Sequence, residues 1–266
     1  MNVTREFCDA IERAEVRSLE YCVRNALQRF TQLNPASRAI GGGLAAFAGV
    51  NSPLSEALGV GLWERAGRDE ALALTEFYRK RGAQPRVRVS PHADPAFVLA
   101  LLDLGYAPLE YENPMVAELQ TLGAQRDPRV AEMRDPQEWS RATGSAFLDG
   151  APCDDSNLLV GLMICTIPQT TALEIRDNGA IVASGCMEVE GDIAAFFGAG
   201  TAPAYRNRGL QSALIADRAA RALERGAKYG RVTTRPASIS EQNFRRIGFV
   251  PLYTRTLWGI PCTSSP

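Results

Sequence analysis

Apolar side chains recur every three or four residues over the first thirty positions of the chain. In "TREFCDAIERAEVRSLEYCVRNALQRF" this spacing predicts one long helix over residues 4–30. The same period, followed by a glycine stop, predicts helices over 69–83 and 94–106. Between these two helices, the alternating "PRVRVSP" (85–91) predicts a short strand. The first half of the chain therefore combines helices with short strands.

The second half shows the same two periods. Helical spacing predicts helices over 136–148 and 154–167. Residues 170–203 predict three strands, because "DNG" and "EGD" are turn sequences between apolar runs. The remaining elements are a helix from about 210 to 225, the strand "RVTTR" (231–235), a short helix "SEQNFRRIG" (240–248) and a final strand "VPLYTRTLW" (250–258).

Two stretches of the chain follow the same order of features. Residues 80–109 and 224–252 both run from a helix end through Arg-Gly-Ala, a strand, a proline turn and a helix to Gly-aromatic and x-Pro-Leu. The offset is 144 residues at Gly82 and Gly226, and 143 at Gly105 and Gly248. A repeat of this size indicates a duplicated domain rather than a solenoid. We expect two related domains, 1–125 and 126–266, joined near "LGAQRDPRV" (122–130).

Composition narrows the class of protein. The 266 residues are 45% hydrophobic and 22% charged, which is typical of a globular protein with a substantial core. The formal net charge of −1 argues against a nucleic-acid or anionic-membrane surface. No apolar run reaches the roughly 18 residues of a membrane span, and the N-terminus shows no signal peptide. We therefore expect a cytoplasmic protein.

The chain lacks the residue patterns of several common disulfide, metal and nucleotide sites. Six scattered cysteines without a CxxC pair (Cys8, Cys22, Cys153, Cys165, Cys186 and Cys262) predict free, mostly buried thiols. The only histidine, His92, lies in a turn-like stretch, so multi-histidine metal sites are excluded and no metal is expected. Gly41-Gly42-Gly43 lacks the Lys-Ser/Thr of a phosphate-binding P-loop, which leaves nucleotide binding there a remote alternative to a strand entry or bulge.

The segment "TAPAYRNRGLQSALIADRAARALERGA" (201–227) places two arginines and a glycine directly before a helix. Two cations at the positive end of a helix dipole are unfavourable unless an anion binds there. Gly209 lets backbone N–H groups converge without an intervening side chain, and Arg206 and Arg208 flank the same point. Together these features predict a cradle for a diphosphate. The strand end beside it could pair with amide groups further along the ligand, as in coenzyme A.

These residues resemble the GNAT superfamily of acetyl-CoA-dependent N-acyltransferases. The resemblance rests on a strand, Pro203, Arg206-x-x-Gly209-x-Gln211, a helix and "NFRRIGF" about 35 residues later, and it covers residues 130–258. The family motif reads Gln/Arg-x-x-Gly-x-Gly/Ala, so glutamine in the last place is a departure that still supplies an amide donor. The resemblance implies an α/β fold of two tandem GNAT-like domains. Each would contain a mixed, mostly antiparallel sheet flanked by helices, with a splayed strand pair for acetyl-CoA in the C-terminal one.

The resemblance also implies roles for individual residues. Backbone groups of Ala199 and Thr201 would pair with the pantetheine arm of acetyl-CoA, the co-substrate. Asn243 and Arg246 would contact the coenzyme from the far side, unless Asn243 only forms a hydrogen bond within its helix. The pyrophosphate would be held by Arg206, Arg208, Gly209, Leu210, Gln211 and Ser212.

The sequence offers several candidates for the proton-transfer groups. Many family members place a tyrosine, which protonates the departing thiolate, where this chain has Phe244. Tyr253 is a candidate replacement, although its surroundings also read as a half-buried strand. A neutral amine needs a base, and Glu188 and Glu190 share one face of the strand "CMEVEG", either as that base or as solvated edge carboxylates. Three acidic residues between the two predicted helices would favour binding of a cationic amine, or they merely cap the helices: Asp149, Asp154 and Asp155.

The first half lacks the corresponding motif. At the 144-residue offset, Arg208-Gly209-Leu210 falls on Glu64-Arg65-Ala66, which indicates a degenerate GNAT-like domain without a phosphate loop. We expect a monomer with pseudo-dimeric halves or a homodimer that acetylates a primary amine, taken as that of a small molecule, by direct attack. The alternative is a catalytically silent acyl-CoA-binding regulatory module. Partners other than the small-molecule acceptor, such as nucleic acid or membrane, are not expected.

Overall fold

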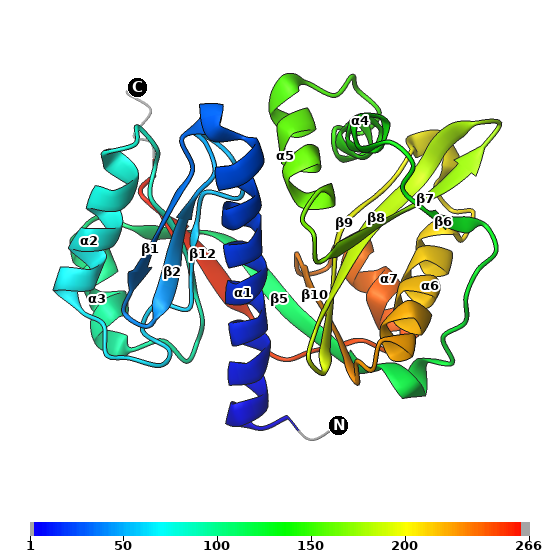
Figure 1. Ribbon diagram of the computed structural model, residues 1–266. Helices are drawn as coiled ribbons and strands as arrows, with labels where there is room; N and C mark the ends of the chain where they lie inside the picture. Colours follow the sequence, from blue (N-terminus) through cyan, green and yellow to red (C-terminus); the bar gives the residue numbers. More distant parts are fainter. Residues whose placement is uncertain (1–2, 262–266) are drawn as a thin grey trace. The chain divides into compact units, whose positions relative to one another are not determined.

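A computed structural model describes residues 3–261 of the chain, which fold into two compact units (Figure 1). The N-terminal unit comprises Val3–Asn113 and the chain from Tyr253 onward, and the C-terminal unit comprises Pro114–Leu252. The units therefore divide the chain at positions other than the expected 125/126. The segment 122–130, expected as a joint, lies inside the C-terminal unit.

The N-terminal unit is a mixed sheet with helices. The strand order is β1-β2-β3-β4-β12-β5, in which only β3 and β4 are parallel neighbours. Its elements are α1 (Arg5–Arg29), the 3-10 turn Thr31–Leu33, β1 (Ala36–Ile40), β2 (Gly43–Phe47), β3 (Ala57–Leu58), α2 (Arg68–Arg79), β4 (Arg86–Val89), α3 (Pro95–Asp103), β5 (Ala107–Glu118, whose residues from Pro114 on belong to the C-terminal unit) and β12 (Arg255–Gly259).

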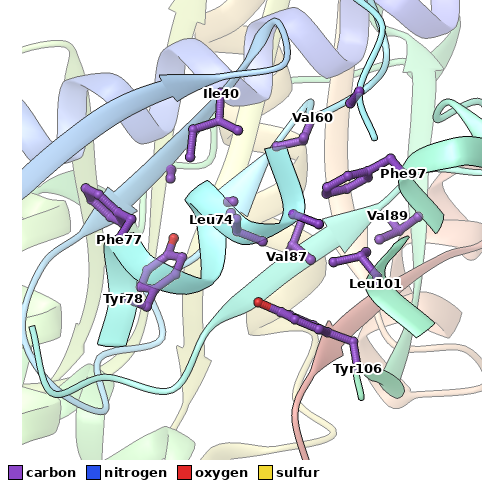
Figure 2. Close-up of a cluster of buried hydrophobic side chains, with 14 of the residues drawn as sticks. Ile40, Val60, Leu74, Phe77, Tyr78, Val87, Val89, Phe97, Leu101 and Tyr106 are labelled. Atoms are coloured by element: carbon purple, nitrogen blue, oxygen red, sulfur yellow. The ribbon is translucent and has the colours of Figure 1, made fainter. Parts of the chain in front are cut away.

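The core of this unit lies between α2, α3 and the sheet (Figure 2). Leu74 and Val87 are fully buried, and the two buried tyrosines keep their hydroxyl groups paired. The Tyr78 hydroxyl donates to the Ala46 carbonyl at 3.0 Å, and the Tyr106 hydroxyl lies 2.8 Å from that of Thr75. Burial raises the pKa of Tyr106 to about 12, so this hydroxyl stays protonated near neutral pH.

The C-terminal unit repeats this plan with a larger sheet. The strand order is β5-β10-β9-β8-β7-β6, with β11 paired to β5, and β9 and β10 are parallel. Its further elements are the 3-10 turn Leu119–Leu122, β6 (Val130–Glu132), α4 (Pro136–Phe147), α5 (Asp155–Cys165), β7 (Thr170–Asp177), β8 (Ala180–Glu190), β9 (Ile193–Thr201), the 3-10 turn Pro203–Tyr205, α6 (Leu210–Glu224), β10 (Tyr229–Thr234), α7 (Ile239–Ile247) and β11 (Val250–Pro251). The predicted α/β class with mixed, mostly antiparallel sheets is confirmed.

Helices cover both faces of this second sheet. Cys186 of β8 packs with Trp139 of α4, whereas its neighbour Met187 packs with residues of α6 and α7. Successive strand residues point to opposite faces, so even-numbered positions near the end of β8 face α4 and α5. Trp139 is fully buried and its indole N–H donates to the Leu173 carbonyl at 2.9 Å, which fixes α4 on the sheet.

The final strand differs from its prediction. The sequence indicated one strand over 250–258, but the structure contains two. β11 pairs with β5 in the C-terminal unit, whereas β12 pairs with β4 and β5 in the N-terminal unit. Residues 252–254 between them carry no strand assignment. Leu252-Tyr253-Thr254 contains neither glycine nor a turn sequence, so the sequence pattern alone did not reveal the break.

Candidate active site

The parallel strands β9 and β10 separate after a short ladder. They pair only from Ile193–Tyr229 to Ala195–Arg231. Both strands then continue without pairing to each other, β9 to Thr201 and β10 to Thr234. The β8–β9 register shifts next to Cys186, and Gly198 has a φ of +57°, so β9 bulges at this level. The result is a wedge whose β9 edge has backbone groups available to an extended ligand.

The helix after this wedge begins without a side-chain cap. Gly209, its N-cap, has a φ of +74°, and no side-chain oxygen accepts from the first turn. The N–H groups of Leu210, Gln211 and Ser212 therefore remain available, since the first intrahelical bond is donated by Ala213 to the Gly209 carbonyl. A Cβ at Gly209 would meet no atom within 4 Å. This open, positively polarised helix end fits the phosphates of a nucleotide coenzyme.

The two predicted phosphate-binding arginines have other partners in the structure. Arg206 forms an ion pair with Asp149 and reaches toward the carbonyls of Ala146 and Thr201, each at 3.4 Å. Arg208 lies over the ring of Tyr205, 4.8 Å from its centroid. Both arginines are exposed. The backbone N–H groups at the α6 N-terminus are therefore uncapped, and the two guanidinium groups lie around them; binding of phosphate there stays a prediction.

Other predicted coenzyme contacts lie close to the same loop or on α7. Ala199 and Thr201 are half-buried on the separated part of β9, and the Thr201 hydroxyl lies 3.5 Å from the Gln211 side-chain oxygen. On α7, Arg246 donates to the Asn243 side chain at 3.1 Å, which agrees with the alternative of a hydrogen bond within the helix. Contact between these groups and a coenzyme stays a prediction.

Phe244 belongs to the core. It is 2% exposed and packs edge-to-face on Phe249, with ring centroids 4.9 Å apart. A tyrosine hydroxyl at this place would enter the apolar cluster of α6, α7 and the sheet. The side chain at this position therefore supplies packing to the C-terminal unit.

Tyr253 lies in the N-terminal unit, not among the residues of the wedge. Its hydroxyl donates to the Glu12 carboxylate at 2.6 Å, and its ring packs edge-to-face on His92. Burial and the adjacent Glu12 charge raise the pKa of Tyr253, which makes it a weaker acid than free tyrosine. These contacts favour the half-buried structural role over proton donation.

Glu188 lies on β8, level with the point at which β9 and β10 separate. It pairs across the sheet with Thr170 on one side and Ala195 on the other, and Ala195 is the last β9 residue paired with β10. The side chain is 2% exposed and belongs to the even-numbered face of β8. Glu190 is two residues further along the same face and is half-buried. The two glutamates thus share one face of β8 next to β9, as predicted, while contact of β9 with a coenzyme stays a prediction.

The three predicted acceptor-side acids separate into different roles. Asp154 is the N-cap of α5 and accepts from Asn157, whose backbone N–H lowers the pKa of Asp154. Asp149 is the partner of Arg206. Asp155 is exposed in the first turn of α5. The alternative of helix capping therefore accounts for Asp154.

The N-terminal unit presents a different helix end where α2 begins. Gly67 is the N-cap of α2, so a glycine does precede this helix, and the 144-residue offset does not hold there. The Glu70 carboxylate accepts from the Gly67 N–H at 2.8 Å, and Asp94 accepts from the Ala66 N–H at 3.4 Å. Carboxylates thus occupy donors that an anionic ligand would need.

Two features are absent from the part of the chain that the structure describes. Over residues 3–261, no three His, Cys, Asp or Glu side chains are grouped as metal ligands. Within the same range, no helix has the length and apolar character needed to cross a bilayer. Cys8, Cys22, Cys153, Cys165 and Cys186 are free thiols, as predicted, whereas Cys262 lies outside the described residues.

The C-terminal unit combines a mixed sheet, a pair of parallel strands that separate and a helix that begins after a glycine. This is the fold of the GCN5-related N-acetyltransferases, and comparison with solved structures shows the same fold. A GCN5-related N-acetyltransferase from Kribbella flavida superposes with a TM-score of 0.64 at 18% identity, covering 90% of this chain and 94% of that one. A tandem GNAT protein from the clavulanic acid biosynthesis pathway gives 0.58 at 14%, covering 86% and 81%. An acetyltransferase of the GNAT family from Colwellia psychrerythraea gives 0.52 at 12%, covering 88% of each chain.

At these identities the likeness establishes the fold. No protein-family model matches the sequence, and no curated protein matches it.

Proposed function

We propose that this chain is a GNAT-type N-acyltransferase that moves the acetyl group of acetyl-CoA to the primary amine of a small molecule. The observation that carries this proposal is the uncapped α6 N-terminus beside the wedge of β9 and β10. A ligand with two phosphates at one end and amides along its length matches both features. The backbone N–H groups of α6 would bind the pyrophosphate, and the β9 edge near Ala199 and Thr201 would pair with the amides.

The remaining predicted contacts surround this path. Arg206 and Arg208 would add positive charge beside the pyrophosphate, and Arg206 would do so by exchanging its partner Asp149 for a phosphate oxygen. Asn243 and Arg246 on the exposed side of α7 would contact the coenzyme beyond the phosphates. The extended arm would then run from Thr201 toward the level of Glu188, which places the thioester near the bulge of β9.

Chemistry at this point requires a neutral amine and a polarised thioester. Glu188, buried at the row where the wedge opens, would accept the amine proton directly or through a held water, with Glu190 as the second candidate. A β9 backbone N–H at the bulge would polarise the thioester carbonyl. Most of the rate gain would come from orienting the two reactants, because no covalent enzyme intermediate is needed.

The acceptor would be cationic before it loses its proton. Asp155 is exposed, and Asp149 would become available whenever Arg206 turns to the coenzyme. The N-terminal unit would be a degenerate GNAT-like domain with a structural role, since its own carboxylates occupy the N-terminus of α2. A cytoplasmic enzyme, either monomeric or homodimeric, remains our expectation.

Release of free thiol from acetyl-CoA tests the proposal. With a panel of small primary amines, we expect amine-dependent thiol release above the hydrolysis background. The alternative is a catalytically silent acyl-CoA-binding module, which the core position of Phe244 favours because the usual acid is missing. Tight binding of coenzyme A without turnover of any amine would support that alternative, and absence of binding would contradict both.

Removing both loop guanidinium groups should weaken coenzyme binding. The double variant Arg206→Ala/Arg208→Ala is expected to raise the Kd of coenzyme A by about tenfold, because two exposed charge-assisted contacts are lost while the backbone cradle remains. Isothermal titration calorimetry provides the measurement. Arg225→Ala is the matched control, since Arg225 lies at the other end of α6 and donates to Thr171 at 2.8 Å. Equal affinity of the double variant and the wild type would contradict the assignment of these arginines.

A further inference from the structure

Arg218 is a fully buried arginine on α6 with an incomplete set of partners. Its side chain is 0% exposed. Nε donates to the Leu214 carbonyl and Nη1 to the Cys186 carbonyl, each at 3.1 Å, and Cζ lies 5.0 Å from the centroid of the Phe196 ring. Nη2 has no hydrogen-bond partner among residues 3–261. A guanidinium carries five N–H donors, so most of its donor capacity is not used.

Arg218 forms no ion pair with a carboxylate among residues 3–261, although the charge of the adjacent Asp217 raises its pKa somewhat. The adjacent Asp217 is held by Arg126, Arg221 and the backbone N–H of Asp127. Burial lowers the pKa of Arg218 to about 10, so the group still carries its proton at neutral pH. Burying an unpaired cation is unfavourable, and such a group next to strands that could hold a ligand points to an electrostatic function.

A glycine of β8, Gly185, leaves space for the Arg218 guanidinium next to the wedge. A Cβ at Gly185 would lie 3.2 Å from Nη1 and 3.3 Å from Cζ of Arg218, and 3.5 Å from the Cβ of Ala199. Gly185 therefore allows the guanidinium to lie against the sheet where β8 and β9 shift register. Arg218 approaches from the α6 face, whereas Glu188 belongs to the face covered by α4 and α5.

We propose that Arg218 is a positioning residue whose buried positive charge acts through the β8–β9 bulge on the thioester of bound acetyl-CoA. This inference rests on the proposed function. In the transfer step, the amine nitrogen forms a bond to the thioester carbon and the carbonyl π electrons move to oxygen. Collapse then breaks the C–S bond, the electron pair leaves on sulfur as the coenzyme thiolate, and the amine loses one proton to the base.

Both the oxyanion and the thiolate carry negative charge that a nearby fixed cation stabilises. This effect would replace the tyrosine acid that Phe244 cannot supply, because a stabilised thiolate can depart before it is protonated. The same charge must act on the product, coenzyme A, whose thiol lies where the thiolate forms. Arg218 should therefore lower the pKa of the bound coenzyme thiol.

The test is the ultraviolet thiolate absorbance of coenzyme A bound to the full-length protein, titrated with pH. We expect the bound thiol to titrate on the order of one pH unit below the free coenzyme in the wild type. In Arg218→Met this difference should disappear and kcat should fall about tenfold with little change in KM. Arg218→Lys should retain most of the difference.

Arg221→Met is the matched control. Arg221 lies one turn further along α6 and is also largely buried, but its charge is paired with Asp217 and Glu132. We expect a lower melting temperature in this variant and no change in the bound thiol titration. If Arg218→Met does not fold, Arg218→Gln keeps a donor at the level of Nε for the Leu214 carbonyl and removes the charge.

Two outcomes would overturn the inference alone. One is a bound thiol that titrates like free coenzyme A in the wild type, and the other is an unchanged titration in a folded, uncharged variant. An unchanged titration together with a lower melting temperature would show that Arg218 only stabilises the packing of α6 on the sheet. Failure of coenzyme A to bind in calorimetry would overturn the proposed function as well, so the two failures are distinguishable.

Discussion

Gly209→Ala is expected to raise the Kd of coenzyme A on the order of 100-fold, equivalent to about 2.7 kcal/mol. Gly209 has a φ of +74°, and a Cβ there would project into space that holds no protein atom within 4 Å. The methyl group should therefore leave the fold intact and occupy the place of the phosphates. Several charge-assisted hydrogen bonds from the α6 N–H groups would then lengthen or break.

A second glycine of the same helix provides the control. Gly226 follows the C-terminal end of α6 and has a φ of +85°, and a Cβ there would likewise meet no atom within 4 Å. Alanine should cost about 1 kcal/mol of folding stability at either site, because both backbones are left-handed. Only Gly209→Ala should lose coenzyme affinity in calorimetry. Equal affinities of the two variants would show that the α6 N-terminus is not the phosphate site.

Local sequence signals predicted the parts from which this site is built. Asn178-Gly179 has positive φ at both residues and closes the β7–β8 hairpin, as "DNG" indicated. The helix after Gly209 begins at the next residue, and Asp154 caps α5. These features depend on backbone preferences within four or five residues, which a sequence shows directly.

Contacts between distant segments were not predictable in the same way. Arg206 was expected to face phosphate, but its ion-pair partner Asp149 is 57 residues away. Arg218 lies within a regular amphipathic helix, and only its place among apolar neighbours in "IADRAARAL" hinted at burial. Which charges meet depends on the register of strands and the packing of helices. Helical period specifies the buried face but not the atoms opposite it.

The largest effect on stability is expected at the end of the chain, in Arg255 of β12. Its guanidinium is 1% exposed and pairs through both terminal nitrogens with Glu15, at 2.6 and 2.7 Å. The same N-terminal unit contains a second guanidinium, Arg88, which bonds Glu56 and Glu112 at 2.8 Å each. The full set is four carboxylates and two guanidinium groups: Glu12, Glu15, Glu56, Glu112, Arg88 and Arg255.

Removing one cation from this cluster leaves buried carboxylates without their partner. Burial lowers the pKa of Arg255, but the charges of Glu15 and Glu12 outweigh burial and hold that pKa well above its ordinary value. Arg255 is therefore charged over the whole range in which the protein can be studied. Arg255→Met should lower the free energy of unfolding by about 3–5 kcal/mol, the usual cost of breaking a buried ion pair from one side.

Urea unfolding followed by circular dichroism measures this loss, and hydrogen exchange should locate it in β4 and β12 of the N-terminal unit. Arg5→Met, which removes an exposed ion pair with Asp9 at 3.0 Å, is the control and should cost no more than about 0.5 kcal/mol. The double variant Glu15→Gln/Arg255→Met should lose less unfolding free energy than the two single variants together. Glutamine is neutral, so removing the arginine no longer leaves a buried charge without a partner at position 15. An Arg255→Met protein with the wild-type urea midpoint would mean that packing of β12, and not its buried charge, joins the end of the chain to the N-terminal sheet.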